Sequence, residues 1–138
     1  MAWVSPELRW SAVPDAVSYA IIMEDPDAAK PKPVVHWVPW NIPARTTALP
    51  AGLQERDRLS GGVLEGVMQG ATSRGTIGWY GPRPPKGDRP HRYHFQLLAL
   101  DRTLDLPLGA ARDDLLRAAA GHVIATGELV GTYAEPTR

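Results

Sequence analysis

Glycine and proline occur throughout the chain, and their frequency limits the length of any helix or strand. The 14 prolines and 13 glycines are scattered between apolar segments and do not form one tract. Proline breaks helices and glycine favours turns, so the pattern indicates many elements joined by turns rather than a disordered linker. The 138 residues suffice for a hydrophobic core, and we expect residues 1–138 to form a single domain.

The segments between these turns read mainly as strands. The clearest are apolar runs of strand length with β-branched residues, at 18–25, 33–43 and 91–101, with a final strand near the C-terminal end and a possible short one at 62–68. One segment, from near Ala110, has a helical pattern, and Gly121 is placed to end it. The sequence therefore predicts a mainly β architecture, a sandwich or a barrel, with at least one peripheral helix.

Alternation along these strands assigns side chains to faces. In 33–43 it predicts one face with Val34, His36, Val38 and Trp40, and another with Val35, Trp37 and Asn41. Pro39 lacks an N–H group, so this strand is expected at an edge of a sheet or bulged. In 91–101 it predicts one face with His91, Tyr93, Phe95, Leu97 and Ala99, and places His94 on the other.

Four polar residues stand out at the strand ends. Asp25 ends a largely apolar face, His36 lies among valines and tryptophans, and His91 and Tyr93 share a face just after a proline-rich loop. They could line one pocket at the rim of a sheet. Taken singly, each also has an ordinary structural reading as a core histidine, a turn-capping aspartate or a core tyrosine.

Other chemistries have weaker support. Two histidines and an aspartate are the ligand types of a non-haem iron site, but their spacing matches no short metal motif. Ser60 and Ser73 lie in glycine-containing loops, yet the chain has no G-x-S-x-G elbow. No phosphate-binding P-loop or dinucleotide motif is present. We expect no metal, no cofactor and no catalytic residue.

An ordered set of short motifs gives a sharper expectation. The stretches "SPELRWSAVP", "EDPDA", "HWVPWNIP", "GPRPP" and "HRYHFQLLALD" resemble the phosphatidylethanolamine-binding protein family, and the tail "AAGHVIATGELVGTY" resembles its bacterial Raf-kinase-inhibitor-like branch. The resemblance implies a β-sandwich with a pocket for anions such as phosphate, phosphoethanolamine or acetate. Carried over to this chain, the pocket residues are Asp25, His36, Gly81, Pro84, Pro85, His91 and Tyr93.

The chain departs from the family pattern at several places. Ala29 replaces a proline, Thr72 and Ser73 stand where an Asn-Asp pair is common, and Arg83 replaces a small residue within the proline loop. We include Arg83 among the expected ligand-binding residues, as a positive lip of the pocket. The chain is also N-terminally short relative to the family, which predicts an exposed edge or patch that a homodimer could cover.

Charge and hydropathy limit the partners. Fifteen basic and fifteen acidic residues balance, which argues against nucleic-acid binding. No apolar run is long enough for a membrane span, and the N-terminus lacks the apolar core of a signal peptide, so a cytoplasmic location is expected. The sequence predicts a small-anion-binding protein that could serve a regulatory role and is not expected to be an enzyme. The alternatives are a protein-interaction regulator of the kinase-inhibitor type and a hydrolase that uses a His/Asp site.

Overall fold

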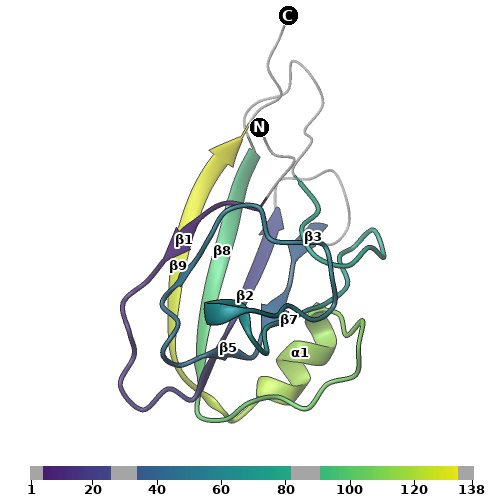
Figure 1. Cartoon of the computed structure of the whole chain (residues 1–138). Coiled ribbons are helices and arrows are strands. Elements are labelled where there is room, and N and C mark those ends of the chain that lie inside the picture. The colour runs from purple at the N-terminus through teal and green to yellow at the C-terminus, as the bar shows by residue number, and fades with distance from the viewer. Residues whose placement is uncertain (1–4, 26–33, 82–90, 134–138) are drawn as a thin grey trace, which may run out of the picture.

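A five-stranded antiparallel sheet forms the centre of the protein (Figure 1). The computed structural model describes residues 5–25, 34–81 and 91–133, with the backbone alone at 91–93 and 129–133. The order along the sheet is β3 (Val34–Trp37), β2 (Ser18–Asp25), β8 (His91–Leu100) and β9 (Val123–Tyr133), and β5 (Ile42–Pro43) also pairs with β2. Two smaller sheets join β1 (Leu8–Arg9) to β6 (Ala48–Leu49) and β4 (Pro39–Trp40) to β7 (Met68–Gln69).

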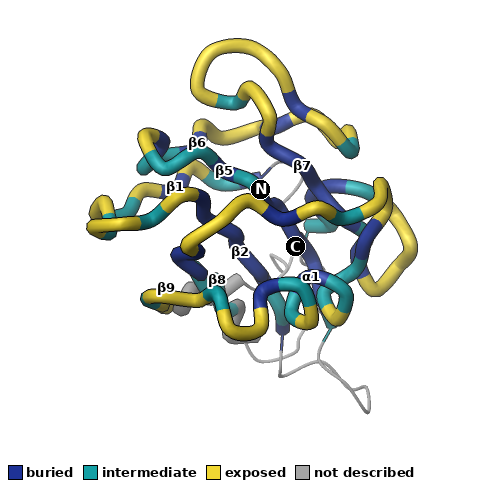
Figure 2. Tube along the Cα trace, turned by 90° about the horizontal axis from the view of Figure 1, so that it is seen from below, coloured by how far each residue is buried: buried dark blue, intermediate teal, exposed yellow. Residues whose placement is uncertain are grey.

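Strand β2 is buried along nearly its whole length, and Figure 2 shows its trace inside a shell of exposed turns. Its alternate residues serve opposite faces of the sheet, as the pleat of a strand requires. Tyr19 and Ile21 belong to one apolar cluster, and Ala20 and Ile22 belong to the other. The single strand thus supplies two cores.

Different segments of the chain cover the two faces of the central sheet. The first cluster is closed by β1, by β6 and by the long connection that contributes Leu53, Leu59 and Val67. The second is closed by the helix and by the segment before it, which contribute Leu104, Ala110 and Leu115. The mainly β prediction is confirmed, and the described strands form open, layered sheets rather than a closed barrel.

The predicted helix is α1 (Arg112–Ala119). Its first turn is closed by Asp114, whose Oδ2 accepts a hydrogen bond of 3.0 Å from the Ala111 N–H, and a carboxylate is favourable at this end of a helix. Gly121 follows the helix with a φ of 81°, a left-handed conformation that glycine adopts without strain. The helix buries Leu115 completely against the second face.

The predicted alternation fails in the segment 33–43. Met23 pairs with Trp37 and Glu24 pairs with Val35, so His36 is an extra residue in the ladder, a β-bulge. The bulge resets the alternation: Val35, Val38 and Trp40 join the second cluster, whereas Trp37 joins the first. The expectation that Val35 and Trp37 share a face was wrong for this reason, whereas Trp37 does lie opposite Val38 and Trp40 as predicted.

The same segment splits into three short strands, and Asn41, which separates β4 from β5, adopts a positive φ of 56°. Asparagine tolerates this conformation better than most residues. Its side chain replaces the missing ladder bonds, since Nδ2 donates to the Leu104 carbonyl (2.9 Å) and Oδ1 accepts from the Leu104 N–H (2.8 Å). The edge position expected for this segment is confirmed for β3, which ends the order of the central sheet.

The possible strand at 62–68 is not a strand over most of its length. Gly62–Leu64 form a 3₁₀ turn, and only Met68 enters a strand. Positive φ values at Gly61, Gly62 and Gly66 explain the difference, because strand backbone requires negative φ.

Candidate functional site

Two buried polar side chains lie at neighbouring strand ends. Asp25 ends β2 with 3% of its surface exposed, and His36 lies on β3 with 4% exposed. Asp25 pairs with Val34, two residues from His36, so the register brings the two positions to the same end of the sheet. Burying such groups costs free energy unless they are hydrogen-bonded, and the site therefore depends on its partners.

The partner of His36 is the backbone of Tyr80. The imidazole Nδ1 lies 2.5 Å from the Tyr80 carbonyl oxygen, and the Tyr80 N–H donates to the His36 carbonyl at 2.9 Å. A carbonyl can only accept, so Nδ1 carries a proton. The rings also stack, with centroids 4.8 Å apart and planes 26° from parallel. These two contacts with Tyr80 fix the orientation of the imidazole.

An aromatic segment holds Tyr80 in place. Trp79 packs edge-on against Trp37, with ring centroids 5.5 Å apart, and stacks on Phe95 at 6.5 Å. The guanidinium carbon of Arg74 lies 5.4 Å from the centre of the Tyr80 ring, a cation–π contact. These contacts anchor the segment just before the proline-rich loop.

Sequence reasoning missed Tyr80 and Arg74 as site neighbours. The usable signal was the aromatic pair Trp79-Tyr80 placed directly before "GPRPP". The contact of Arg74 has no such signal, because it depends on how the loop folds back.

The structure places the predicted site residues in three groups. Asp25 and His36 lie on adjacent strands, and Gly81, half-buried, directly follows the Tyr80 that binds His36. Arg83, Pro84 and Pro85 lie outside the described residues. His91 and Tyr93 are on β8, where their backbones pair with Tyr133 and Gly131, and their side chains are outside the description. The ligand-binding role of all eight residues remains a prediction.

Among the residues that the structure describes, no three His, Cys, Asp or Glu side chains gather closely enough to hold a metal ion. An imidazole whose Nδ1–H is already bonded can donate from Nε2 when it is doubly protonated, and a nearby carboxylate favours that charged form. No helix among the described residues is long and apolar enough to cross a membrane.

Comparison with known proteins agrees with this fold. The family profile described as phosphatidylethanolamine-binding protein matches residues 2–134. A protein named UPF0098 protein from Methanothermobacter thermautotrophicus is 45% identical over 131 residues, which cover 94% of this chain and 82% of that protein.

Two crystal structures superpose closely, each with a TM-score of 0.83 and 35% identity over 96% of this chain. One is the phosphatidylethanolamine-binding protein homolog CT736 from Chlamydia trachomatis, of which 82% is covered. The other is YbcL from Escherichia coli, described as a member of the mammalian PEBP family, of which 81% is covered.

Proposed function

The chain belongs to the phosphatidylethanolamine-binding protein family, and from this premise we propose that it binds small anions, such as phosphate or a phosphorylated headgroup. The proposed pocket is formed by Asp25, His36 and Gly81, together with the loop and strand positions predicted from the sequence. The observation that carries the proposal is the fixed imidazole of His36. Its Nδ1–H is bonded to the Tyr80 carbonyl, and the buried Asp25 ends the neighbouring strand.

The two charged groups have different roles in this proposal. A carboxylate repels an anion, so Asp25 is not expected to contact the ligand. It stabilises positive charge on the histidines of the pocket, and the imidazolium Nε2–H then donates to a ligand oxygen. The stacked Tyr80 ring limits rotation of the imidazole, so little side-chain entropy is lost when the anion binds.

The test is a titration with phosphate, monitored by the NMR signals of the histidine rings. We expect saturable shifts of the His36 signals, and replacing His36 with Asn should weaken binding about ten- to a hundredfold, the range of one charge-assisted hydrogen bond. His122→Asn is the matched control, because His122 pairs with Asp101 at the opposite end of β8. Unchanged His36 signals at saturating phosphate would exclude the proposal.

A pH series tests the charge argument separately. Sulfate is the better probe here, because its charge stays constant from about pH 5 to 9. The imidazolium fraction falls as the pH rises, so sulfate affinity should fall in the same direction. Constant affinity over this range would refute the argument that a charged imidazole binds the anion.

The same preparation distinguishes a hydrolase. An enzyme that uses a histidine as general base would turn over phosphomonoester or acyl ester substrates, and the activity would disappear in His36→Asn. We expect the protein to bind phosphate and to hydrolyse none of these substrates. Measured turnover that depends on His36 would replace the binding proposal with the hydrolase.

A further inference from the structure

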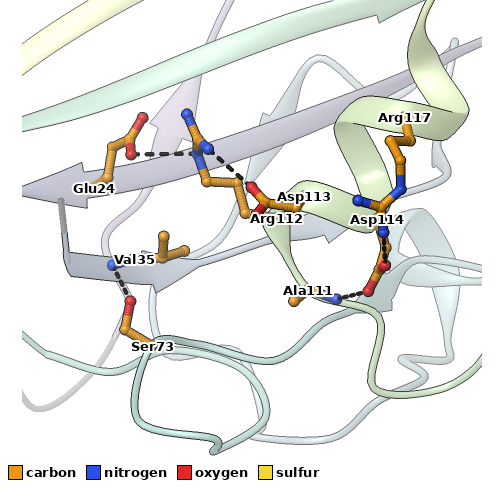
Figure 3. A network of polar contacts seen from close by, with 8 residues as sticks. All are labelled: Glu24, Val35, Ser73, Ala111, Arg112, Asp113, Asp114 and Arg117. Carbon is orange, nitrogen blue, oxygen red and sulfur yellow. Dashed lines mark hydrogen bonds and ion pairs between the residues drawn. The ribbon is translucent and has the colours of Figure 1, made fainter. Parts of the chain in front are cut away.

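A cavity of about 360 Å³ lies on the other side of the strand ends that carry Asp25 and His36. Its wall includes Glu24 and Val35, the residues that immediately precede the two pocket residues in the chain. The rest of its wall is formed by the 71–73 segment and the start of α1, which contact these strands through Ser73 and Arg112 (Figure 3). One short stretch of each strand therefore faces the proposed pocket and this cavity at once.

Ser73 binds the outer edge of β3 at two points. Its Oγ accepts a hydrogen bond of 2.7 Å from the Val35 N–H, and its own N–H donates to the Val35 carbonyl at 3.0 Å. Figure 3 shows the Oγ bond at the edge of the strand. Both backbone groups of Val35 are therefore used by one residue, as in a regular strand ladder.

The turn that carries Ser73 is internally fixed. The Thr72 N–H donates to the Thr76 carbonyl at 2.8 Å, and the hydroxyl groups of these two threonines are 2.9 Å apart. The Gly75 N–H bonds back to the Thr72 carbonyl at 2.9 Å. A turn closed by three such bonds holds Ser73 firmly against β3.

These bonds bear on His36 because of the bulge. His36 is the extra residue of this bulge, so its register with β2 is irregular. Ser73 holds the preceding residue, Val35, from the outer edge of the strand, and the Tyr80 N–H bonds to the His36 carbonyl. The direction of the imidazole depends on both attachments.

We propose that Ser73 is a positioning residue of the anion pocket, which it never touches: its hydroxyl fixes the bulge and thereby aims His36 at the ligand. This inference rests on the proposed function for its binding readout. It also assigns a role to Ser73, a residue at which this chain departs from the common family sequence. Without the hydroxyl, the Val35 N–H turns to water in the adjacent cavity, and the bulge loses one of its two attachments on that side.

The experiment compares Ser73→Ala with Ser73→Thr and with Ser60→Ala. Threonine keeps the accepting oxygen, and the cavity beside Val35 leaves space for its extra methyl group. Ser60 is an exposed serine elsewhere in a loop and controls for the substitution itself. Phosphate affinity is measured by calorimetry, the melting temperature by scanning calorimetry, and the His36 ring signals by NMR without ligand.

We expect Ser73→Ala to weaken phosphate binding about two- to tenfold, the range of one neutral hydrogen bond, and to shift the His36 signals before any ligand is added. Ser73→Thr and Ser60→Ala should bind like the wild type. Because Ser73 is exposed, its loss should change the melting temperature little. A purely structural role would lower the melting temperature and leave both His36 signals and affinity unchanged.

Failure of this inference is separable from failure of the proposed function. If the wild type does not bind phosphate, the proposed function is wrong, and the ligand-free His36 signals alone decide the role of Ser73. If the wild type binds phosphate and Ser73→Ala binds equally well with unshifted His36 signals, the positioning role is refuted. A loss of affinity that Ser73→Thr fails to restore would also refute it.

Discussion

Gln69 is a buried polar side chain on which three parts of the fold depend, and its removal gives a quantitative test of the structure. The residue is fully buried. Its Oε1 accepts a hydrogen bond of 2.7 Å from the Trp37 indole, and its Nε2 donates to the backbone carbonyls of Gln54 and Arg56 at 2.7 and 2.8 Å. One amide thus joins β7 to β3 and to the 54–56 loop.

The size of the stability loss follows from the hydrogen-bonding groups that Gln69→Ala would leave without a partner. A buried donor or acceptor without a partner costs about 1–3 kcal/mol. The indole N–H of Trp37 is fully buried, so its loss of a partner carries the whole of this cost. The carbonyls of Gln54 and Arg56 can form hydrogen bonds with water instead, because these two residues are exposed. The lost amide also leaves space in the core. We expect a loss of about 3–4 kcal/mol in the free energy of unfolding, a large part of the ~5–15 kcal/mol typical of a domain.

Urea unfolding followed by tryptophan fluorescence measures this loss. With a urea slope of about 1.5 kcal/mol per M, the midpoint should fall by roughly 2 M. Gln54→Ala is the matched control, because it removes an exposed side chain and keeps the carbonyl that Gln69 uses. A loss below about 1 kcal/mol for Gln69→Ala would show that water replaces the amide and that the reasoning is wrong.

Three other substitutions test separate features. Gly70→Ala should cost about 2 kcal/mol or more in a urea titration, because the added Cβ would lie 2.8 Å from the Trp40 ring and closer still to backbone; wild-type stability would contradict that packing. Asn41→Ala should cost about 1–3 kcal/mol, since it removes two hydrogen bonds at a positive φ, and Asn41→Gly should recover only the backbone part. Arg112→Ala should cost at most about 1 kcal/mol, because its 3.3 Å ion pair with Glu24 is partly exposed, and 0.5 M salt should shrink the difference.

The sequence predicted the regular part of the fold well. Strand 18–25 and the helix after Ala110 follow from apolar periodicity and from terminal signals such as Gly121, which are local properties of the chain. The face shared by Phe95, Leu97 and Ala99 is likewise confirmed in the first cluster. These elements form as predicted because local preference and tertiary burial agree.

The sequence did not predict the irregular backbone of 33–43. Pro39 signalled an edge or a bulge, but the bulge lies at His36 and the change of sheet lies at Asn41. Both features depend on distant partners, Tyr80 for His36 and Leu104 for Asn41, so no window of local sequence contains the information. Propensity is overridden by tertiary contacts at such positions.

The bulge also explains why the candidate site could be found from residue types while its geometry could not. A regular strand would have put His36 in the alternation predicted for it, and its ring would then face the second cluster with Val38 and Trp40. The bulge instead puts Val35 in the second cluster, opposite Trp37, and leaves His36 beside the aromatic segment, where Tyr80 binds both its ring and its backbone. The direction of the imidazole is therefore fixed by Tyr80, in the connection 73–80, and not by its own strand alone. Substitutions in that connection should alter ligand affinity even though they lie outside the motifs that identify the family.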